Sequence, residues 1–142
     1  MLPGDLKPRM DKTVTENDMN QPVVQYASDD FVALRARSSV EEALECIRSS
    51  QTQSAILYFY VVDDEDRLVG VVPTRRLLTS SLAASVESIM TESLVAVPDN
   101  ANLMEALEFF ILYKFLAFPV VDADRKILGV IDVNLFTQEM ID

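Results

Sequence analysis

The chain contains 142 residues, 49% of them hydrophobic, which is enough for one compact domain or for two small halves that share a core. Its net charge is −11, from 23 acidic and 12 basic residues. This charge disfavours nucleic acid and anionic membrane surfaces as partners, because both attract basic surfaces. It is compatible with cation binding or simply with solubility.

The single cysteine, Cys46, excludes an intramolecular disulfide and indicates a reducing compartment. Its neighbours Ala43, Leu44 and Ile47 predict a buried apolar position rather than a reactive thiol. The longest apolar run, residues 109–121, is too short to span a bilayer. We therefore expect a cytoplasmic chain with no direct membrane insertion, either as a separate protein or as part of a membrane protein.

Residues 1–22 are polar, contain three prolines and lack the apolar segment of a secretion signal, so we expect a flexible leader. Residues 23–26 are expected to form a short extended segment. The first unit is then expected to contain a strand, a helix, two strands and a short helix, at residues 31–34, 40–47, 55–62, 67–72 and 74–78. Ser38 or Ser39 caps the first helix, and Pro73 ends the last strand because it suits the start of a helix.

A short helical link at residues 85–90 leads to the second unit. Its strands are expected at residues 94–97, 115–121 and 127–131, and a closing helix at residues 133–140. Between the first two strands lies a helix whose predicted core face carries four apolar residues, namely Leu103, Leu107, Phe110 and Ile111.

The two units repeat each other. The hairpins match at an offset of 59, with residues 60–63 and 67–72 against residues 119–122 and 126–131. The preceding strands and helices match at an offset of 63, with residues 31–34 and 40–44 against residues 94–97 and 103–107. The first unit therefore carries four extra residues, around positions 49–54. Gly70 and Gly129, at the same place in both return strands, indicate backbone that either needs conformational freedom or is approached closely by another segment.

Both copies contain a strand ending in Val-Val-Asp, an acidic turn and a strand of the form Leu-Val-Gly-Val-Val or Ile-Leu-Gly-Val-Ile. This pattern resembles a tandem pair of cystathionine β-synthase (CBS) domains, also called a Bateman module, over roughly residues 27–140. The link at residues 86–91 is similar to the phrase that commonly opens a second CBS unit. The resemblance implies an α/β fold of two β-α-β-β-α units packed as a pseudo-two-fold pair, and a homodimer through the CBS units. It divides the chain into a leader at residues 1–22, a first unit at 23–84 and a second at 85–142.

Within that family, the aromatic-rich strand at residues 55–63 is similar to the cytosolic CBS region of MgtE-type magnesium transporters. This narrower resemblance implies a role in regulating magnesium transport, with a transporter or another effector domain as partner. The acidic domain that usually precedes the CBS pair in those transporters is absent from this sequence.

CBS pairs bind adenosine-containing ligands in clefts between the units, so the resemblance implies ATP or AMP as a regulatory ligand. In the family pattern, a hydroxyl residue after the return strand faces phosphate, and an Asp three residues later binds the ribose hydroxyls. This chain has Pro73 and Arg76 at those positions in the first copy, and Asp132 and Leu135 in the second. Neither copy keeps the ribose carboxylate, and Asp132 would repel phosphate unless a metal ion intervened.

If one cleft binds, we favour the cleft completed by the second copy. Its candidate residues are Val32, Ala33, Tyr58, Ala117, Phe118, Pro119, Ile131 and Asp132. The opposite cleft would use Tyr60, Pro73, Thr74, Arg76, Val95 and Ala96.

Four consecutive acidic residues, 63–66, invite a hard cation, but consecutive side chains in a turn diverge, so we expect a solvated turn. A response to Mg²⁺ is implied instead by acidic faces of two subunits, as the MgtE resemblance suggests. The chain has no histidine and no Gly-rich phosphate loop, so we expect no enzyme activity and no required cofactor. Three functions remain open: a ligand-sensing regulatory module, a structural dimerisation module without a ligand, and the cytosolic gate of a magnesium transporter.

Overall fold

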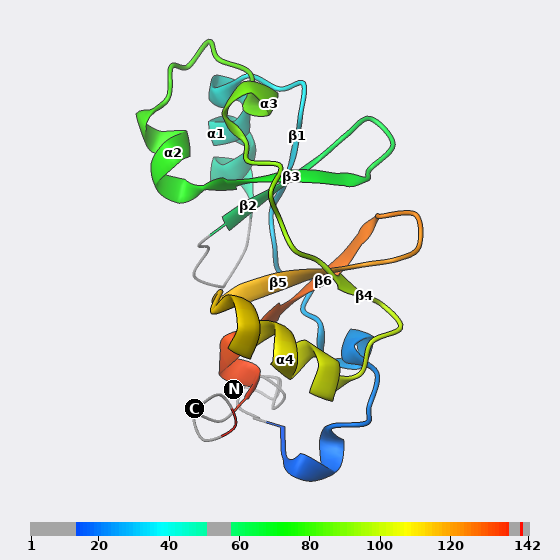
Figure 1. Ribbon diagram of the computed structural model, residues 1–142. Helices are drawn as coiled ribbons and strands as arrows, with labels where there is room; N and C mark the ends of the chain where they lie inside the picture. Colours follow the sequence, from blue (N-terminus) through cyan, green and yellow to red (C-terminus); the bar gives the residue numbers. More distant parts are fainter. Residues whose placement is uncertain (1–13, 51–57, 137–139, 141–142) are drawn as a thin grey trace, which may run out of the picture.

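The computed structural model describes residues 14–50, 58–136 and 140. Two three-stranded sheets lie one above the other, and each is accompanied by its own helices (Figure 1). The strands are β1 (Ala33–Arg35), β2 (Tyr58–Val62) and β3 (Leu68–Pro73) in the first sheet, and β4 (Val97–Pro98), β5 (Ala117–Val121) and β6 (Ile127–Asp132) in the second. Each sheet has the same order and directions: the first strand is parallel to the second, which is antiparallel to the third. The predicted α/β fold of two similar units is therefore confirmed.

The helices follow the same repeat. They are α1 (Val40–Ser49), α2 (Thr74–Thr79) and α3 (Val86–Ile89) near the first sheet, α4 (Leu103–Tyr113) on the second, and the 3₁₀ turns η2 (Glu16–Asp18), η3 (Val23–Tyr26) and η4 (Val133–Leu135). Ser39 and Glu42 form a capping box at the start of α1, each side chain accepting a hydrogen bond from the other residue's backbone N–H. Asn102 and Glu105 form the same box at the start of α4. Two helix starts 63 residues apart thus use the same local chemistry.

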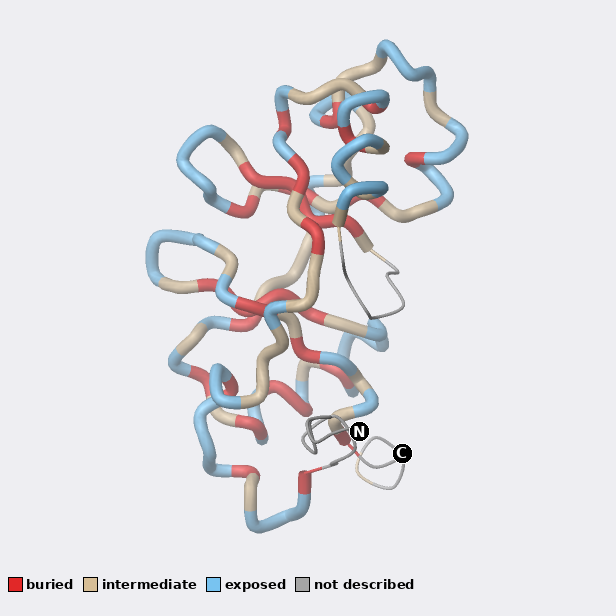
Figure 2. The backbone as a smooth tube through the Cα atoms, turned by 180° about the vertical axis from the view of Figure 1, so that it is seen from behind, coloured by how far each residue is buried: buried red, intermediate tan, exposed pale blue. Residues whose placement is uncertain are grey.

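The two hairpin turns are also built alike. The Asp63 carboxylate accepts hydrogen bonds from the backbone N–H groups of Glu65 and Arg67, both at 2.9 Å, which closes the turn locally. Asp122, 59 residues later, accepts the two equivalent bonds at 2.9 Å. The turns project side by side and are exposed, whereas the strands behind them are largely buried (Figure 2). The acidic residues thus lie in a solvated turn, as predicted.

The units exchange short segments around their pseudo-two-fold axis. Ser28 pairs with Val130 of the second sheet through two backbone hydrogen bonds of 2.8 Å. Reciprocally, Thr91 pairs with Val71 of the first sheet through bonds of 2.9 and 3.0 Å. The close approach expected at Gly70 is real, because a Cβ there would lie 2.5 Å from a methionine sulfur. These crossings join the two units into one body.

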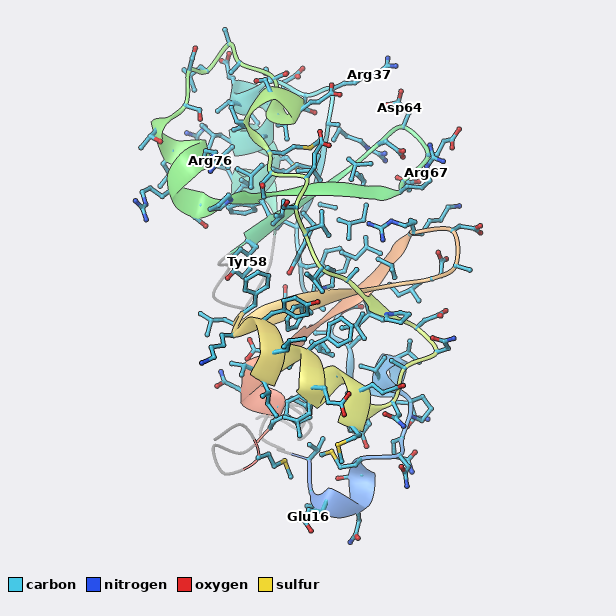
Figure 3. All side chains as sticks on the ribbon, in the orientation of Figure 1. Glu16, Arg37, Tyr58, Asp64, Arg67 and Arg76 are labelled. Atoms are coloured by element: carbon cyan, nitrogen blue, oxygen red, sulfur yellow. The ribbon has the colours of Figure 1, made fainter. Side chains whose placement is uncertain are left out.

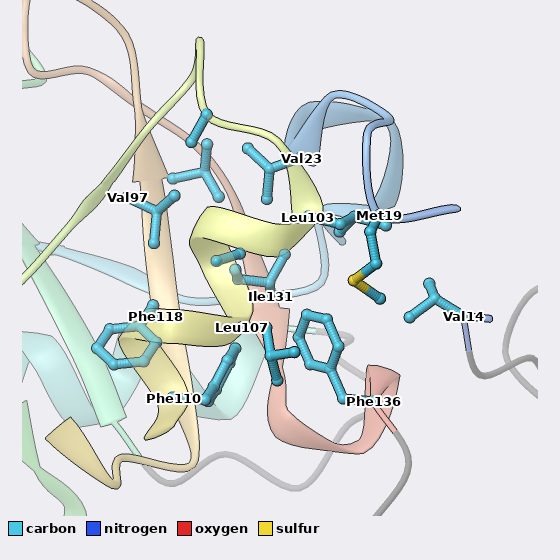
Figure 4. Close-up of a cluster of buried hydrophobic side chains, with 13 residues drawn as sticks. Val14, Met19, Val23, Val97, Leu103, Leu107, Phe110, Phe118, Ile131 and Phe136 are labelled. Atoms are coloured by element: carbon cyan, nitrogen blue, oxygen red, sulfur yellow. The ribbon is translucent and has the colours of Figure 1, made fainter. Parts of the chain in front are cut away.

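Three apolar clusters hold the molecule together. One lies within each unit, and a third between the sheets is built on Tyr60, Leu68 and Val121. The cluster of the second unit also includes Val14, Met19 and Val23, which pack against α4 (Figure 4). Val14 and Met19 are therefore part of this core, which differs from the flexible leader predicted for residues 1–22. Residues 1–13 lie outside the described part of the chain.

Several predicted elements differ in the structure. Residues 23–26 form the 3₁₀ turn η3 rather than an extended segment. The first strand of each unit begins later than expected, at Ala33 and Val97. The predicted closing helix is interrupted, since Phe136 follows the 3₁₀ turn η4 in an extended conformation. Residues 51–57 and 137–139, where parts of a loop, a strand and this helix were predicted, lie outside the described residues.

Two predictions of side-chain burial are wrong. Cys46 is exposed, because it falls outside the arc of α1 that carries Val40 and Ala43 into the core. Ile111 is 43% exposed, and Ala106 takes the place expected for it on the core face of α4. Both errors come from assigning a helix face that is one residue too wide.

Candidate functional site

A cavity of about 160 Å³ lies between the two sheets, and we call it the sheet-interface cavity. Four segments from both repeats line it. They are β2 and β3 with Tyr58, Tyr60, Val71 and Pro73, the crossing segment with Thr91, Ser93, Leu94 and Val95, and the residues just before and within β5, namely Phe115, Ala117 and Pro119. Tyr58 lies in the space between β2 and β5 (Figure 3). The cavity therefore depends on the relative placement of the two units.

The strand periodicity explains this lining. Tyr58 and Tyr60 are two residues apart on β2, so both side chains lie on the face of the first sheet opposite to Phe59 and Val61. Phe59 and Val61 pack into the core of their own unit. The tyrosines are therefore left for the interface between the sheets.

Tyr60 is the most enclosed polar side chain at the cavity, with 4% of its surface exposed. Burial, with smaller contributions from Tyr58 and the charge of Asp132, raises the pKa of its phenol far above the ordinary value, so the hydroxyl keeps its proton. The ring meets Phe31 edge to face, at a centroid distance of 6.4 Å. Among the described residues, the Tyr60 hydroxyl has no hydrogen-bond partner.

Some of the residues predicted for each of the two clefts line the sheet-interface cavity. Tyr58, Ala117 and Pro119 come from the cleft that the sequence favoured, and Tyr60, Pro73 and Val95 from the opposite one. Val71, Thr91, Ser93, Leu94 and Phe115 were missed. Val71 could have been found from its alternation with Pro73 on one strand. The crossing segment could not, because only the folded chain brings it beside β3.

The remaining candidates lie elsewhere. Val32, Phe118 and Ile131 are buried within the unit cores. Asp132 caps η4 by accepting a 2.7 Å hydrogen bond from a backbone N–H, and Arg76 donates to the carbonyl of Ile89 at 3.1 Å. Ala33 belongs to β1, Thr74 begins α2, and Ala96 packs on the central cluster.

The acidic turn is neutralised by arginines rather than gathered around a cation site. Asp66 pairs with Arg35 at 2.8 Å and Asp64 with Arg37 at 3.1 Å. Figure 3 shows Asp64 at the hairpin turn that follows β2. Asp63 pairs with the guanidinium of Arg67 at 2.9 Å. Within residues 14–50, 58–136 and 140, no three His, Cys, Asp or Glu side chains come together as metal ligands.

A second surface feature lies on α4. Met104, Ile111 and Leu112 are 43%, 43% and 72% exposed, and we call these three residues the α4 patch. The positions 63 residues earlier, on α1, carry Glu41, Arg48 and Ser49. The same helix in the same fold therefore tolerates a polar surface in the first unit but has an apolar one in the second.

Comparisons with known proteins agree with the repeat. The CBS domain family matches residues 23–83 and 86–134. The magnesium transporter MgtE of Thermus thermophilus is 31% identical over 106 residues, which are 74% of this chain and 24% of the transporter. The chain thus spans about a quarter of this curated relative.

Solved structures show the same similarity. The cytosolic domain of the Mg²⁺ channel MgtE in complex with ATP matches with a TM-score of 0.70 and 31% identity, over 77% of this chain and 44% of that domain. The protein CBSX2 in complex with AMP matches with a TM-score of 0.64 and 28% identity, over 80% and 91%. In the described part of the chain, no helix combines the length and apolar character needed to cross a membrane. The chain belongs to the CBS domain family, as a tandem pair of CBS domains similar to the cytosolic region of MgtE-type magnesium transporters.

Proposed function

We propose that this CBS pair is a non-catalytic regulatory module that senses a ligand in the sheet-interface cavity and passes the signal to a second copy of the chain or to an effector domain. The observation that carries the proposal is the cavity itself, which is lined by both repeats. A ligand that contacts both sheets stabilises one relative placement of the two units. Such differential stabilisation is what a regulatory ligand requires.

Two relatives support an adenine nucleotide as the ligand. The similar MgtE cytosolic domain is in complex with ATP and CBSX2 with AMP. An adenosine compound is therefore the first ligand to test here, with Mg²⁺ as the second because of the transporter relatives. We place the module in the cytoplasm and relate it to the control of magnesium transport on the same basis.

The α4 patch is the proposed surface for homodimerisation. Phe115 lies just after α4, lines the sheet-interface cavity and is 41% exposed. Its ring also contacts Tyr113, with centroids 6.3 Å apart. A ligand that displaces Phe115 therefore disturbs the C-terminal end of α4, next to the patch. This contact supplies a short physical route from the cavity to the dimer.

A second function, a structural dimerisation module without a ligand, is favoured by one specific observation. The residues at the family's phosphate and ribose positions are Pro73, Arg76, Asp132 and Leu135. Arg76 and Asp132 are already engaged with backbone groups of the protein. On this hypothesis the α4 patch still associates, but nothing occupies the cavity.

Thermal unfolding separates the two functions. The melting temperature is measured with ATP, AMP, S-adenosylmethionine or Mg²⁺, each alone at millimolar concentration. A ligand at about 100 times its dissociation constant adds about 2.7 kcal/mol of stability, a shift of several degrees for a chain of this size. No shift with any compound contradicts ligand sensing and leaves the structural module.

Sedimentation tests the dimer. Leu112→Arg places a charge in the α4 patch and is expected to give a monomer with an unchanged melting temperature at low protein concentration. Ser49→Arg, at the equivalent position of α1, is the matched control and leaves the dimer intact. Equal sedimentation of both variants refutes the α4 interface.

A further inference from the structure

We infer that two copies of the chain associate through α4 alone, in an antiparallel contact centred on Ile111 in which Glu108 of each copy pairs with the partner's Lys114. The inference rests on the proposed dimer and names its arrangement. It keeps the two first units apart, so that the dimer is open rather than closed through both CBS units.

Exposed apolar side chains are concentrated on α4 and on the residues just after it. Ten large apolar side chains are exposed in the described part of the chain, and six of them lie within residues 104–116, namely Met104, Ile111, Leu112, Tyr113, Phe115 and Leu116. Such a concentration on one element is typical of a contact surface. A second copy supplies an identical surface, and an isologous contact buries both at once.

The first unit lacks an equivalent surface. None of the ten residues of α1, all of which are described, exposes a large apolar side chain. Packing α4 of one copy on α1 of the other would therefore bury charged side chains against apolar ones, which is costly. Because α1 and α4 lie at opposite ends of the two stacked sheets (Figure 1), a contact through α4 places the first units away from each other.

Two charges flank the apolar centre with the spacing that an antiparallel contact needs. Glu108 lies three residues before Ile111, and Lys114 three residues after it. Both side chains are exposed, and among the described residues neither has an ion-pair or hydrogen-bond partner. Glu105, the other acidic residue of α4, is already engaged at the helix start.

The direction of the contact follows from these charges. An antiparallel pair of α4 helices, with the two-fold axis at Ile111, brings each Glu108 opposite the partner's Lys114. Two reciprocal ion pairs then border the apolar centre. A parallel pair would instead bring the two Glu108 carboxylates together, and like charges repel.

Sedimentation equilibrium of the full chain at low salt tests the ion pairs. Glu108→Lys is expected to weaken dimerisation about 5- to 25-fold, because two pairs are lost per dimer and each exposed pair contributes up to about fivefold. Glu45→Lys, at the equivalent position of α1, makes the same change in net charge and should leave dimerisation unchanged. The double variant Glu108→Lys with Lys114→Glu should return to within about twofold of the wild type, because both pairs form again with their charges exchanged.

The sign of the first effect is informative. Each copy carries a net charge of −11, so a less negative chain is expected to associate more tightly when only overall repulsion matters. Unchanged or tighter association of Glu108→Lys, or a double variant that stays weak, overturns the arrangement and leaves the proposed dimer in place. A Leu112→Arg chain that still dimerises overturns both.

Cys46 provides an independent measurement, because it is exposed on α1. A short bismaleimide is expected not to link the wild-type dimer, since the two Cys46 thiols lie far apart. The same reagent should link the double variant Cys46→Ser with Ile111→Cys, whose two thiols meet at the two-fold axis. Linkage of the wild type, or none in the double variant, contradicts the antiparallel contact through α4.

Discussion

Gly70 and Gly129 provide a test of the reciprocal crossing. The atoms nearest to Gly129 are rigid, whereas the atoms nearest to Gly70 belong to a flexible side chain. A Cβ on Gly129 would lie 2.8 Å from the Cβ of Ala27 and 2.9 Å from the carbonyl oxygen of Ser28. Both neighbours belong to rigid backbone or to its first side-chain atom. A Cβ on Gly70 would lie 2.5 Å from the sulfur of Met90, a flexible side chain that can move away. Its nearest backbone atom would be the carbonyl oxygen of Thr91 at 3.1 Å, a less severe contact than those at Gly129.

The expected costs follow from these contacts. Overpacking against a rigid neighbour costs about 1–3 kcal/mol, and the Ser28–Val130 hydrogen bonds beside Gly129 add about 1 kcal/mol if one is lost. The alanine recovers about 0.4–1 kcal/mol through the unfolded state. We therefore expect Gly129→Ala to destabilise by about 2–3 kcal/mol, and Gly70→Ala, where the methionine yields, by about 1 kcal/mol or less.

Urea unfolding followed by circular dichroism measures both values. A difference of about 2 kcal/mol corresponds to roughly 8 °C in melting temperature for a chain of this size. The double variant Ala27→Gly with Gly129→Ala removes one of the two close contacts and should recover part of the loss. Equal losses for Gly70→Ala and Gly129→Ala refute the argument, since the crossings would then be equally rigid or equally loose.

Three other predictions concern single residues. Lys114 follows α4 in the left-handed region with φ of 59°, so Lys114→Gly is expected to raise the free energy of unfolding by about 0.5–1 kcal/mol, measured in urea; a loss of stability contradicts it. Hydrogen bonds from the backbone N–H of Arg67 and of Glu65, with the Arg67 guanidinium, hold the pKa of Asp63 below its ordinary value of 3.8. Its charged form therefore stabilises the fold above about that pH, and this contribution is lost as the pH falls through the lower, folded-state pKa. The free energy of unfolding, measured as the pH is lowered, should therefore fall differently in the wild type and in Asp63→Asn within that window. Identical pH dependence in the two proteins argues against a stabilising role of the Asp63 carboxylate. Cys46 is exposed, so a maleimide should label the folded protein at the rate of the unfolded chain, and strong protection in native buffer contradicts the assigned face of α1.

Local features of the chain were predictable because they repeat. The helix caps at Ser39 and Asn102 follow from residue type and spacing, since capping chemistry needs only residues within one helical turn. The acidic hairpin turns follow in the same way from Asp63 and Asp122. Close approach at Gly70 was one of the two reasons that the sequence offered for a glycine there, and the sequence did not indicate the partner.

The predicted ligand clefts were less accurate because they join segments far apart in the chain. Six of the fourteen candidates line the sheet-interface cavity, but they come from both proposed clefts. Phe118 and Ile131 look like interface residues in the sequence and are buried in their own unit instead. Alternation along a strand divides its residues between two faces, but it does not say which face meets the other sheet.

The amino-acid sequence was sufficient for the repeat, the order of elements within each unit and the CBS family, because these depend on periodicity and residues close together in the chain. It did not predict that Val14 and Met19 join the core of the second unit, or that Thr91 pairs with Val71. Nor did it place Tyr58 and Tyr60 opposite Ala117 around one cavity. Those arrangements arise from packing two sheets across a pseudo-two-fold axis, where the gain comes from apolar surface buried between distant segments.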